Sequence, residues 1–508
     1  MKIGIDIGTT YSAVSYVNRE YKTVLVKDTE FGAITTPSVV WLGNSRCLVG
    51  QSALDRISID PESILCWLFK REIGNNEVII SDHNNNDWTA EGLTALVIKK
   101  MINDSEKQLE KKVTGATITV PVHFNMKQRS GVINAAKMAG LDMVEILDEP
   151  VAAAIHYGYS QLTADSDKKI LVFDLGGGTF DVTILLLNKK GFYTLASHGD
   201  TNVGGQDIDR IIMRMVSEYI KDIGAFVMWD AYNNQLLRKA AEKIKIAMNG
   251  WHGDYRANII LSNWSGEVVI NKESYDRKVY DFFDKCFEST KACIKEASLN
   301  IEDIDHHIFV GGSCKNSLLR RCYESFFDTP SGSTSLFEPD IAISHGAAIY
   351  GDRSKMNNDQ SFSELRGVIG YNLGLKIYNT DKKCAEIETI IVKNSPLPSI
   401  NKRVLYKSHR NQEYIDLHVV SYVEHEADLL DIGELKIGPL RQSDYNYEIE
   451  LNVTVAKDGR VEVEVIDLQT GDEINKTLSY LDDYNQMLVR QKLIIDKLVI
   501  NRIKPKMV

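Results

Sequence analysis

Two glycine turns, far apart in the chain, share one pattern: an apolar strand that ends in an acid, then glycine and threonine, then a second apolar strand. The turns are residues 6–10 (DIGTT) and residues 174–179 (DLGGGT). Consecutive glycines let backbone N–H groups converge on one anion, because no Cβ stands in the way. One such turn alone is usually an ordinary hairpin, but an internal repeat indicates two related halves. We therefore predict that the two turns clamp the phosphates of a nucleotide from both sides of a cleft.

Composition limits the class of protein. The chain has 508 residues, enough for two to four domains, and its net charge of −11 disfavours nucleic acid or an anionic membrane as the main partner. No apolar run reaches the roughly 18 residues that would cross a bilayer, and no basic, apolar leader precedes the first strand. The 7 cysteines form no C-x-x-C pair, which favours reduced thiols. These features predict a cytoplasmic protein.

The secondary-structure pattern changes once along the chain. Strands alternate with helices up to residue 352, which predicts an α/β fold with helices over a mixed sheet. A polar stretch follows, and alternating strands then take over, with an Asp-Gly turn at 458–459 that is typical of a hairpin. Residues 481–503 have helical periodicity. The predicted units are residues 1–352, a linker at 353–367, a β domain at 368–480 and a helical tail at 481–508.

Further polar features occur in the α/β part of the chain. A third strand ends in two glycines (310–313), and a pair of glycines at 204–205 precedes a helix whose free N-terminus suits an anion. Charged residues at helical spacing (242–249) and a basic pair (70–71) are by themselves typical of solvated faces.

These motifs together resemble those of the heat-shock protein 70 chaperones of the DnaK type, over almost the whole chain. Residues 5–12 and 172–182 are similar to that family's two phosphate signatures nearly letter for letter, and residues 310–315 resemble its third signature in a degraded form. The short tail and modest length look most like the HscC-type branch. The resemblance implies an actin-like, two-lobed α/β ATPase domain, followed by an all-β sandwich domain that binds peptides and by a short C-terminal helix, a remnant of the family's lid.

The resemblance also implies roles for individual residues. ATP or ADP would bind with Mg²⁺, and with K⁺, between the two lobes. The metal ligands would be Asp6, Asp174 and Asp181. The catalytic residues would be Lys70, Glu149, Asp174, Thr179 and Asp181, of which Lys70 and Glu149 would position the attacking water. The nucleotide-binding residues would be Gly8, Thr9, Thr10, Tyr11, Gly176, Gly177, Gly178, Thr179, Gly204, Gly205, Glu242, Lys245, Asn249, Gly311, Gly312, Ser313, Lys315 and Asp340. A relay that reports ATP binding to the next domain would comprise Pro121, Arg129 and Glu149.

Three positions depart from the family pattern in the nucleotide site. Ile246 and Lys315 stand where the family has arginines, and Gln206 stands where it has glutamate. Neither Ile246 nor Lys315 offers a planar guanidinium that could stack on adenine. We therefore predict weaker ATP affinity than in the main branch of the family, with the phosphate chemistry intact.

The β domain resembles the family's peptide-binding domain at residues 368–376 and 392–398. Tyr378, Leu405 and Ile415 fall near the peptide groove, although their strand pattern fits plain core residues equally well. Such a groove binds extended apolar peptide through main-chain hydrogen bonds and side-chain pockets.

Two further departures concern coupling and release. The linker at 362–368 is only partly apolar, which puts coupling between the domains in question, and a groove almost without a lid should release peptide quickly. The partners implied by the resemblance are unfolded polypeptide clients, a J-domain co-chaperone and a nucleotide-exchange factor, and the protein is expected to be a monomer.

Other functions share parts of this pattern. A small-molecule kinase or an actin-like filament protein has the acid-ended hairpins and the lobed cleft, but neither accounts for the β domain. An interaction or nucleotide-exchange protein with weak or uncoupled turnover also shares the fold, and Lys70, Glu149, Asp174 and Thr179 argue against it. The chain has no Gly-Lys pair, so it has no Walker P-loop.

Overall fold

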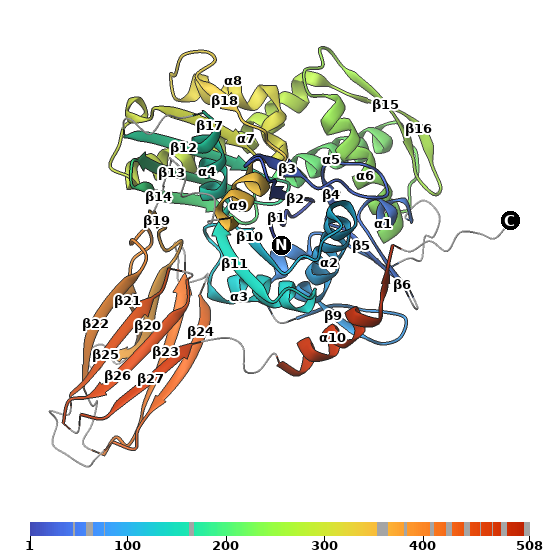
Figure 1. Ribbon diagram of the computed structural model, residues 1–508. Coiled ribbons are helices and arrows are strands. Elements are labelled where there is room, and N and C mark those ends of the chain that lie inside the picture. Colours follow the sequence, from blue (N-terminus) through green and yellow to red (C-terminus); the bar gives the residue numbers. More distant parts are fainter. Residues whose placement is uncertain are drawn as a thin grey trace.

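The computed structural model describes residues 1–43, 46–56, 64–75, 77–161, 167–352, 364–379, 384–406, 411–422, 429–440, 448–457, 459–469, 471–478 and 485–501. It is a mixed α/β structure with several sheets and a short C-terminal helix (Figure 1).

Two six-stranded sheets form the centre of the α/β part. The first has the order β11-β10-β1-β2-β3, with β4 paired to β2, and the second has the order β18-β17-β12-β13-β14-β19. In each sheet a central strand pairs antiparallel with the next strand across a glycine turn, and parallel with a strand from much later in the chain. The repeat seen in the two turns therefore extends to the sheets that carry them.

The strands of the first sheet are β1 (Lys2–Asp6), β2 (Tyr11–Val17), β3 (Thr23–Leu25), β4 (Thr36–Pro37), β10 (Gly115–Val120) and β11 (Met143–Asp148). Those of the second are β12 (Lys168–Leu175), β13 (Phe180–Asn188), β14 (Gly191–Asp200), β17 (His306–Val310), β18 (Thr334–Leu336) and β19 (Glu364–Arg366). Smaller sheets contain β5 (Val40–Leu42), β6 (Arg46–Val49) and β7 (Ile64–Cys66), β8 (Val78–Ser81) and β9 (Asp87–Thr89), and β15 (Tyr255–Ile260) and β16 (Ser265–Ile270).

Two helices, α4 (Glu149–Gln161) and α9 (Ala342–Gly351), pack on each other between the large sheets (Figure 1). Glycine makes this close packing possible. A Cβ on Gly4 of β1 would lie 2.1 Å from the Ala348 nitrogen, and a Cβ on Gly346 would lie 1.8 Å from the Ala152 carbonyl oxygen. The other helices are α1 (Gln51–Arg56), α2 (Ala90–Leu109), α3 (Met126–Met138), α5 (Gly205–Asp222), α6 (Ala231–Ala247), α7 (Lys272–Glu296) and α8 (Ser317–Phe326), with single turns η1 (Phe69–Glu72), η2 (Ile301–Asp303) and η3 (Gly312–Lys315).

The β part of the chain consists of two four-stranded antiparallel sheets, ordered β21-β20-β23-β24 and β22-β25-β26-β27. Buried residues from both sheets form one apolar cluster. The predicted hairpin around Gly459 joins β25 to β26. The strands are β20 (Asn372–Asn379), β21 (Cys384–Ile391), β22 (Ser399–Tyr406), β23 (Ile415–Tyr422), β24 (Leu430–Ile437), β25 (Glu448–Val455), β26 (Val461–Asp467) and β27 (Glu473–Leu478).

The β part lies against the α/β part. Met126 of α3 belongs to the apolar cluster of the β sheets, and its sulfur accepts the Val461 N–H at 3.4 Å. A Cβ on Gly370 would lie 2.3 Å from the Val122 carbonyl oxygen, so the two backbones touch there. Asn394 accepts the Ser197 N–H at 3.0 Å and donates to Glu296 at 2.7 Å.

Both ends of the β part add a strand to a sheet of the α/β part. Most of the predicted linker (353–363) lies outside the described residues, but β19 pairs parallel with β14. The predicted tail helix at 481–503 ends earlier than expected: α10 spans Asn485–Lys497, and β28 (Val499–Ile500) then pairs parallel with β6. Residues 481–484 and 502–503 lie outside the described residues.

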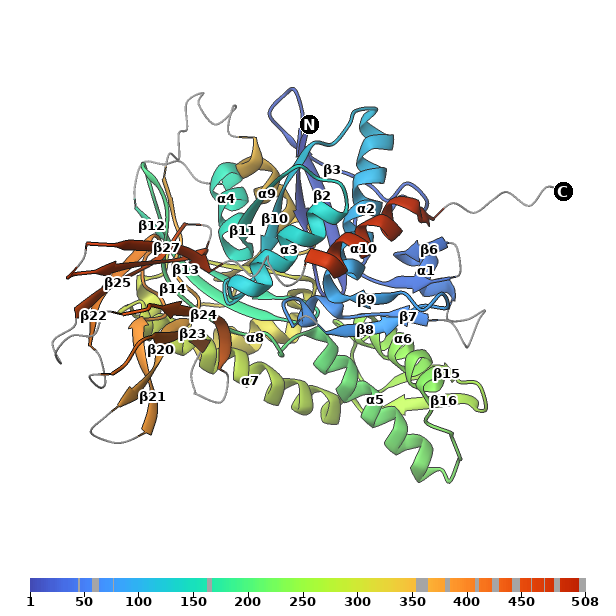
Figure 2. The same cartoon turned by 90° about the horizontal axis from the view of Figure 1, so that it is seen from below.

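Helix α10 packs on α2 and α3 (Figure 2). Leu488 and Ile495 join the apolar core there. Gln491 is 1% exposed, donates to the Asp87 carbonyl at 3.0 Å and accepts from the Thr89 hydroxyl at 3.2 Å. Among the helices that the structure describes, none is both long and apolar enough to cross a membrane.

Replacing Gln491 by alanine should detach α10. The change leaves the buried Thr89 hydroxyl without its acceptor, a loss of about 1–3 kcal/mol, and also removes the hydrogen bond to the Asp87 carbonyl. We expect faster amide hydrogen exchange across α10 and earlier protease cleavage of the tail than in Lys492→Ala, whose exposed side chain lies on the same helix. Equal protection in the two variants would contradict the prediction.

Candidate functional site

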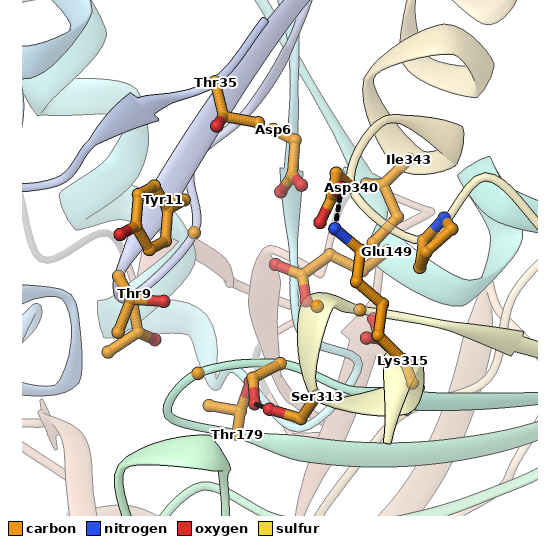
Figure 3. A pocket seen from close by; sticks show the side chains of 18 of the residues that line it. Asp6, Thr9, Tyr11, Thr35, Glu149, Thr179, Ser313, Lys315, Asp340 and Ile343 are labelled. Carbon is orange, nitrogen blue, oxygen red and sulfur yellow. Dashed lines mark hydrogen bonds and ion pairs between the residues drawn. The ribbon is translucent and has the colours of Figure 1, made fainter. Parts of the chain in front are cut away.

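A cavity of about 330 Å³ lies between the two glycine turns. Figure 3 shows Asp6, Thr9 and Tyr11 on one side of it, and Thr179, Ser313 and Lys315 on the other. The cavity brings together most of the predicted site: Asp6, Gly8, Thr9, Thr10, Tyr11, Lys70, Glu149, Asp174, Gly176, Gly177, Thr179, Glu242, Lys245, Gly311, Gly312, Ser313, Lys315 and Asp340. Thr35, Ile246, Pro339 and Ile343 also line it.

The two turns touch each other at the back of the cleft. A Cβ on Gly177 would lie 2.1 Å from the Thr10 hydroxyl oxygen, and a Cβ on Gly178 would lie 2.4 Å from the Thr9 methyl carbon. Both contacts are shorter than any real Cβ contact, so the approach of the turns requires glycine. The triple glycine therefore keeps backbone amides accessible and also lets the two sheets meet.

The third glycine turn (residues 311–313) packs against the second (residues 174–179). Gly311 has a positive φ of 85°, and a Cβ there would lie 2.4 Å from the Leu175 carbonyl oxygen. The Ser313 hydroxyl donates to the Gly176 carbonyl at 2.8 Å. Gly204 and Gly205 do not line the cavity but stand behind this turn: Gly205 donates its N–H to the Gly176 carbonyl at 2.9 Å, and a Cβ on Gly204 would meet the Gly178 backbone at 2.6 Å. Gly178 and Asp181 do not line the cavity either.

A buried ion pair stands at the base of the cleft. The Lys70 ammonium lies 2.8 Å from a Glu149 carboxylate oxygen, and neither side chain is more than 6% exposed. Lys70 comes from η1, and Glu149 is the first residue of α4, before Pro150. Burial alone would lower the pKa of Lys70. The nearby negative charges of Glu149 and Asp6 outweigh it and raise the pKa above the ordinary value, so the side chain stays charged.

Carboxylates outnumber this one ammonium. Burial, reinforced by Glu149, raises the pKa of Asp6 to about 7 and raises the pKa of Asp174 and of Asp181 well above the ordinary value. Asp181 Oδ1 is buried and has no hydrogen-bond partner among the described residues. Mg²⁺ prefers oxygen ligands, and a dication beside these acids would offset their mutual repulsion. The donor set therefore fits Mg²⁺.

The wall opposite the glycine turns comes from α6 and the segment before α9. The Tyr11 hydroxyl donates to Glu242 at 3.1 Å, and Lys245 pairs with Asp209 at 2.8 Å. Ile246 is 65% exposed at the rim of the cavity, and Lys315 pairs with Asp340. Asn249 does not line the cavity: it donates to the Lys315 carbonyl at 2.8 Å and accepts the Ser317 N–H at 3.0 Å, which holds the third turn.

Arg71 is a site residue that the sequence pattern did not reveal. The basic pair at 70–71 reads as a solvated face, yet Lys70 is buried and Arg71 donates to the Gly178 carbonyl across the cleft. The Gln206 amide lies against the same guanidinium. Arg71 thus joins the first half of the α/β part to the second, and only the tertiary structure brings its two partners together.

Of the predicted relay residues, Arg129 and Pro121 lie near the contact with the β part, whereas Glu149 lies in the cleft. Arg129 donates to Asp148 at 2.6 Å and to the Phe124 carbonyl at 2.9 Å, and Pro121 begins the turn in which Phe124 N–H bonds to its carbonyl. A Cβ on Gly459 would lie 3.1 Å from Arg129 Cδ.

His123 connects the site to this contact more directly. Its Nδ1 lies 3.0 Å from the Gly370 carbonyl oxygen, and its Nε2 lies 3.6 Å from Asp181 Oδ1. Burial lowers the pKa of His123 to about 4, so the imidazole is neutral.

The three residues predicted near a peptide groove occupy different environments. Ile415 is 8% exposed and belongs to the apolar cluster of the β sheets, and Leu405 packs partly against the same cluster. Tyr378 lies in β20, but its side chain is outside the described residues. Residues 380–383 and 407–410, which join β20 to β21 and β22 to β23, are also outside them.

A family model described as Hsp70 protein matches residues 2–493. The chain therefore belongs to the Hsp70 family. Membership implies an ATP-dependent chaperone that binds ATP or ADP together with Mg²⁺.

Because the pKa of Asp6 is raised, we predict that the free energy of unfolding of the cation-free protein decreases as pH rises. The folded state binds the Asp6 proton more tightly than the unfolded state, whose carboxyl titrates near 3.8, so stability falls as pH rises from there to about 7. Asp6→Asn removes this loss. At about pH 8 without divalent cations, we expect the variant to be roughly 2–4 kcal/mol more stable than wild type, with no advantage near pH 4.

Urea midpoints at the two pH values measure this difference, with Asp222→Asn as the control because Asp222 is exposed at the end of α5. An Asp6→Asn advantage that does not change with pH would contradict the prediction.

Proposed function

We propose that the protein hydrolyses ATP and couples hydrolysis to the binding and release of extended apolar peptide segments of unfolded proteins. The observation that carries the proposal is the buried Lys70–Glu149 pair at the base of a cleft between two matched, acid-ended glycine turns. Phosphoryl transfer to water depends mainly on positioning and charge neutralisation, and this arrangement offers both.

Each part of the cleft has a role in the proposed reaction. Asp6, Asp174 and Asp181 would hold Mg²⁺, which when bound neutralises charge on the phosphates. Backbone amides at 8–10 and 176–179 would cradle the β- and γ-phosphates, with the Thr179 hydroxyl beside the γ-phosphate. The Glu149 carboxylate would orient the attacking water, and the Lys70 ammonium would face the charge that develops on the phosphate. Glu242, Lys245 and the 311–315 turn would contact ribose and adenine, and K⁺ is expected near the phosphates.

The α/β part would act as an actin-like, two-lobed ATPase domain (1–352), and the two antiparallel sheets as a sandwich that binds peptide (368–480). Their shared apolar cluster supports the sandwich. Tyr378, Leu405 and Ile415 stay the candidate groove residues on family grounds. A J-domain co-chaperone, a nucleotide-exchange factor, a monomeric state and a cytoplasmic location are expected on family grounds.

Contacts between the two parts support coupling. Asp181 faces His123, and His123 meets the Gly370 backbone, so a shift of Asp181 toward a metal ion would alter a contact with the β part. Arg129 stands between Asp148 and Gly459 in the same region. The pairing of β19 with β14 adds a direct mechanical connection.

An ATP-binding protein with weak, uncoupled turnover is the second candidate. The observation that favours it is at the rim of the cavity, where Ile246 is exposed and Lys315 pairs with Asp340. Neither side chain has a planar guanidinium that could stack on adenine.

Turnover assays with Lys70→Ala test the proposed activity. Wild-type protein should hydrolyse ATP and turn over faster with an unfolded peptide, whereas Lys70→Ala should be slower by about 100-fold or more while still binding nucleotide. Lys243→Ala, an exposed lysine on α6, is the matched control. Turnover without peptide stimulation would favour the uncoupled candidate, and unchanged turnover in Lys70→Ala would refute the catalytic role.

Introducing the family's arginines at positions 246 and 315 should tighten nucleotide binding. A guanidinium over an aromatic base contributes about 0.5–2 kcal/mol, so Ile246→Arg with Lys315→Arg should bind ATP about 2- to 30-fold more tightly in calorimetric titrations. Ile260→Arg adds the same charge at a 74% exposed position outside the cavity, and should leave affinity unchanged. Equal ATP affinity of the double variant and wild type would contradict the prediction that the missing arginines weaken ATP binding.

A further inference from the structure

Outside the nucleotide cleft, two histidines and a glutamate bring three ligand atoms together. His156 is on α4, His345 is on α9, and Glu338 is in the segment before α9. His156 Nε2 lies 2.7 Å from Glu338 Oε2 and 3.2 Å from His345 Nδ1, and His345 Nδ1 lies 3.4 Å from Glu338 Oε2. Both imidazoles are buried, whereas the Glu338 side chain is 47% exposed.

The close packing of the two helices creates this convergence. Gly346 of α9 lies directly against the Ala152 backbone of α4. His345 is the neighbour of Gly346, and His156 stands one helical turn after Ala152. The two imidazoles therefore meet edge to face, with ring centroids 4.7 Å apart and planes at 78°.

No placement of protons on two neutral imidazoles makes all three contacts favourable. If both facing nitrogens carry protons, both can donate to the Glu338 oxygen, but the 3.2 Å contact between the two nitrogens then has two donors and no acceptor. If only one of them does, the other presents a lone pair to the ionised Glu338 carboxylate. If neither does, three lone pairs converge. The last arrangement suits a cation that accepts all three lone pairs.

Burial also keeps the imidazoles available as ligands. It lowers the pKa of His156 and lowers the pKa of His345 to about 4, although Glu338 acts in the opposite direction. Neutral imidazole is the form that binds metals.

The spacing fits a small tetrahedral cation. Zinc takes histidine nitrogen and carboxylate oxygen at about 2.0–2.2 Å, which puts tetrahedral ligand atoms about 3.3–3.5 Å apart. Two of the observed separations, 3.2 and 3.4 Å, are close to this range, and the 2.7 Å separation has to open by about 0.6 Å. Since Glu338 is at the surface, its side of the cluster is open to a water ligand.

We propose that His156, Glu338 and His345 bind one divalent transition-metal ion of the zinc class, with water as the fourth ligand. The ion would join α4, whose first residue is Glu149, to the segment that contains Asp340. It would thus stabilise two walls of the nucleotide cleft from behind. This site is separate from the acids of the cleft and does not depend on the proposed ATPase activity.

Titration of the full-length protein with Co²⁺ tests the proposal. After removal of metals with a chelator, and with excess Mg²⁺ to occupy oxygen-rich sites, we expect one equivalent of Co²⁺ with the intense visible bands of four-coordinate cobalt, displaced by Zn²⁺. Glu338→Gln and His345→Gln should each weaken binding by at least about 10-fold and lose the bands. Zinc should raise the melting midpoint of wild type but not that of Glu338→Gln.

The group His418, Asp431 and Glu434, in the β part, supplies the control. His418→Gln should leave the cobalt spectrum and stoichiometry unchanged. Glu338 is half exposed, so its variant is expected to fold, and circular dichroism checks this. Absence of a saturable cobalt spectrum in wild type, its persistence in folded Glu338→Gln, or its loss in His418→Gln would each overturn the proposal.

Discussion

The ion pair between Lys70 and Glu149 is the interaction on which the cleft between the two glycine turns depends. Among the described residues it places one ammonium beside three buried carboxylates (Glu149, Asp174 and Asp181) and the half-buried Asp6, and burying such groups is unfavourable unless they are paired. The chain accepts the excess of acid by holding the pKa of Asp6, Asp174 and Asp181 high. The cleft is therefore arranged for added positive charge, and a bound metal ion would lower the free energy of the folded state.

The geometry that makes this cleft is duplicated. Five strands of the two large sheets follow the same order, and each sheet presents its glycine turn to the other. The turns meet where Gly177 faces Thr10 and Gly178 faces Thr9, at distances that no larger residue allows. Helices α4 and α9 hold the sheets together on the far side through a second glycine contact, Gly346 against Ala152. Steric constraint at a few glycines thus sets the width of a site whose chemistry comes from acids and one lysine.

Sequence reasoning located the glycine turns from the residues themselves, because these motifs are local and contiguous. Lys70, Glu149, Glu242 and Lys245 were located only through the family resemblance. Sequence reasoning missed what depends on long-range packing. Arg71 was part of an unremarkable basic pair until the fold placed Gly178 opposite it. The contact of His123 with Gly370 joins residues 247 positions apart. The strand β28 is two residues long and has no periodicity of its own; only its pairing with β6 defines it.

The way the β part is attached follows from the same strand pairing. The chain enters it through β19, which extends the second large sheet, and leaves it toward α10 and β28, which pack on the first half of the α/β part. The β part is therefore held between two separate anchor points, one on each half. A change in the separation of the halves moves the anchors relative to each other. Such movement strains the contacts at Gly370, Met126 and Asn394, whose hydrogen bonds and packing join the β part to the α/β part. The proposed coupling would then not require an apolar linker motif, because β19 and α10 attach the β part to different halves.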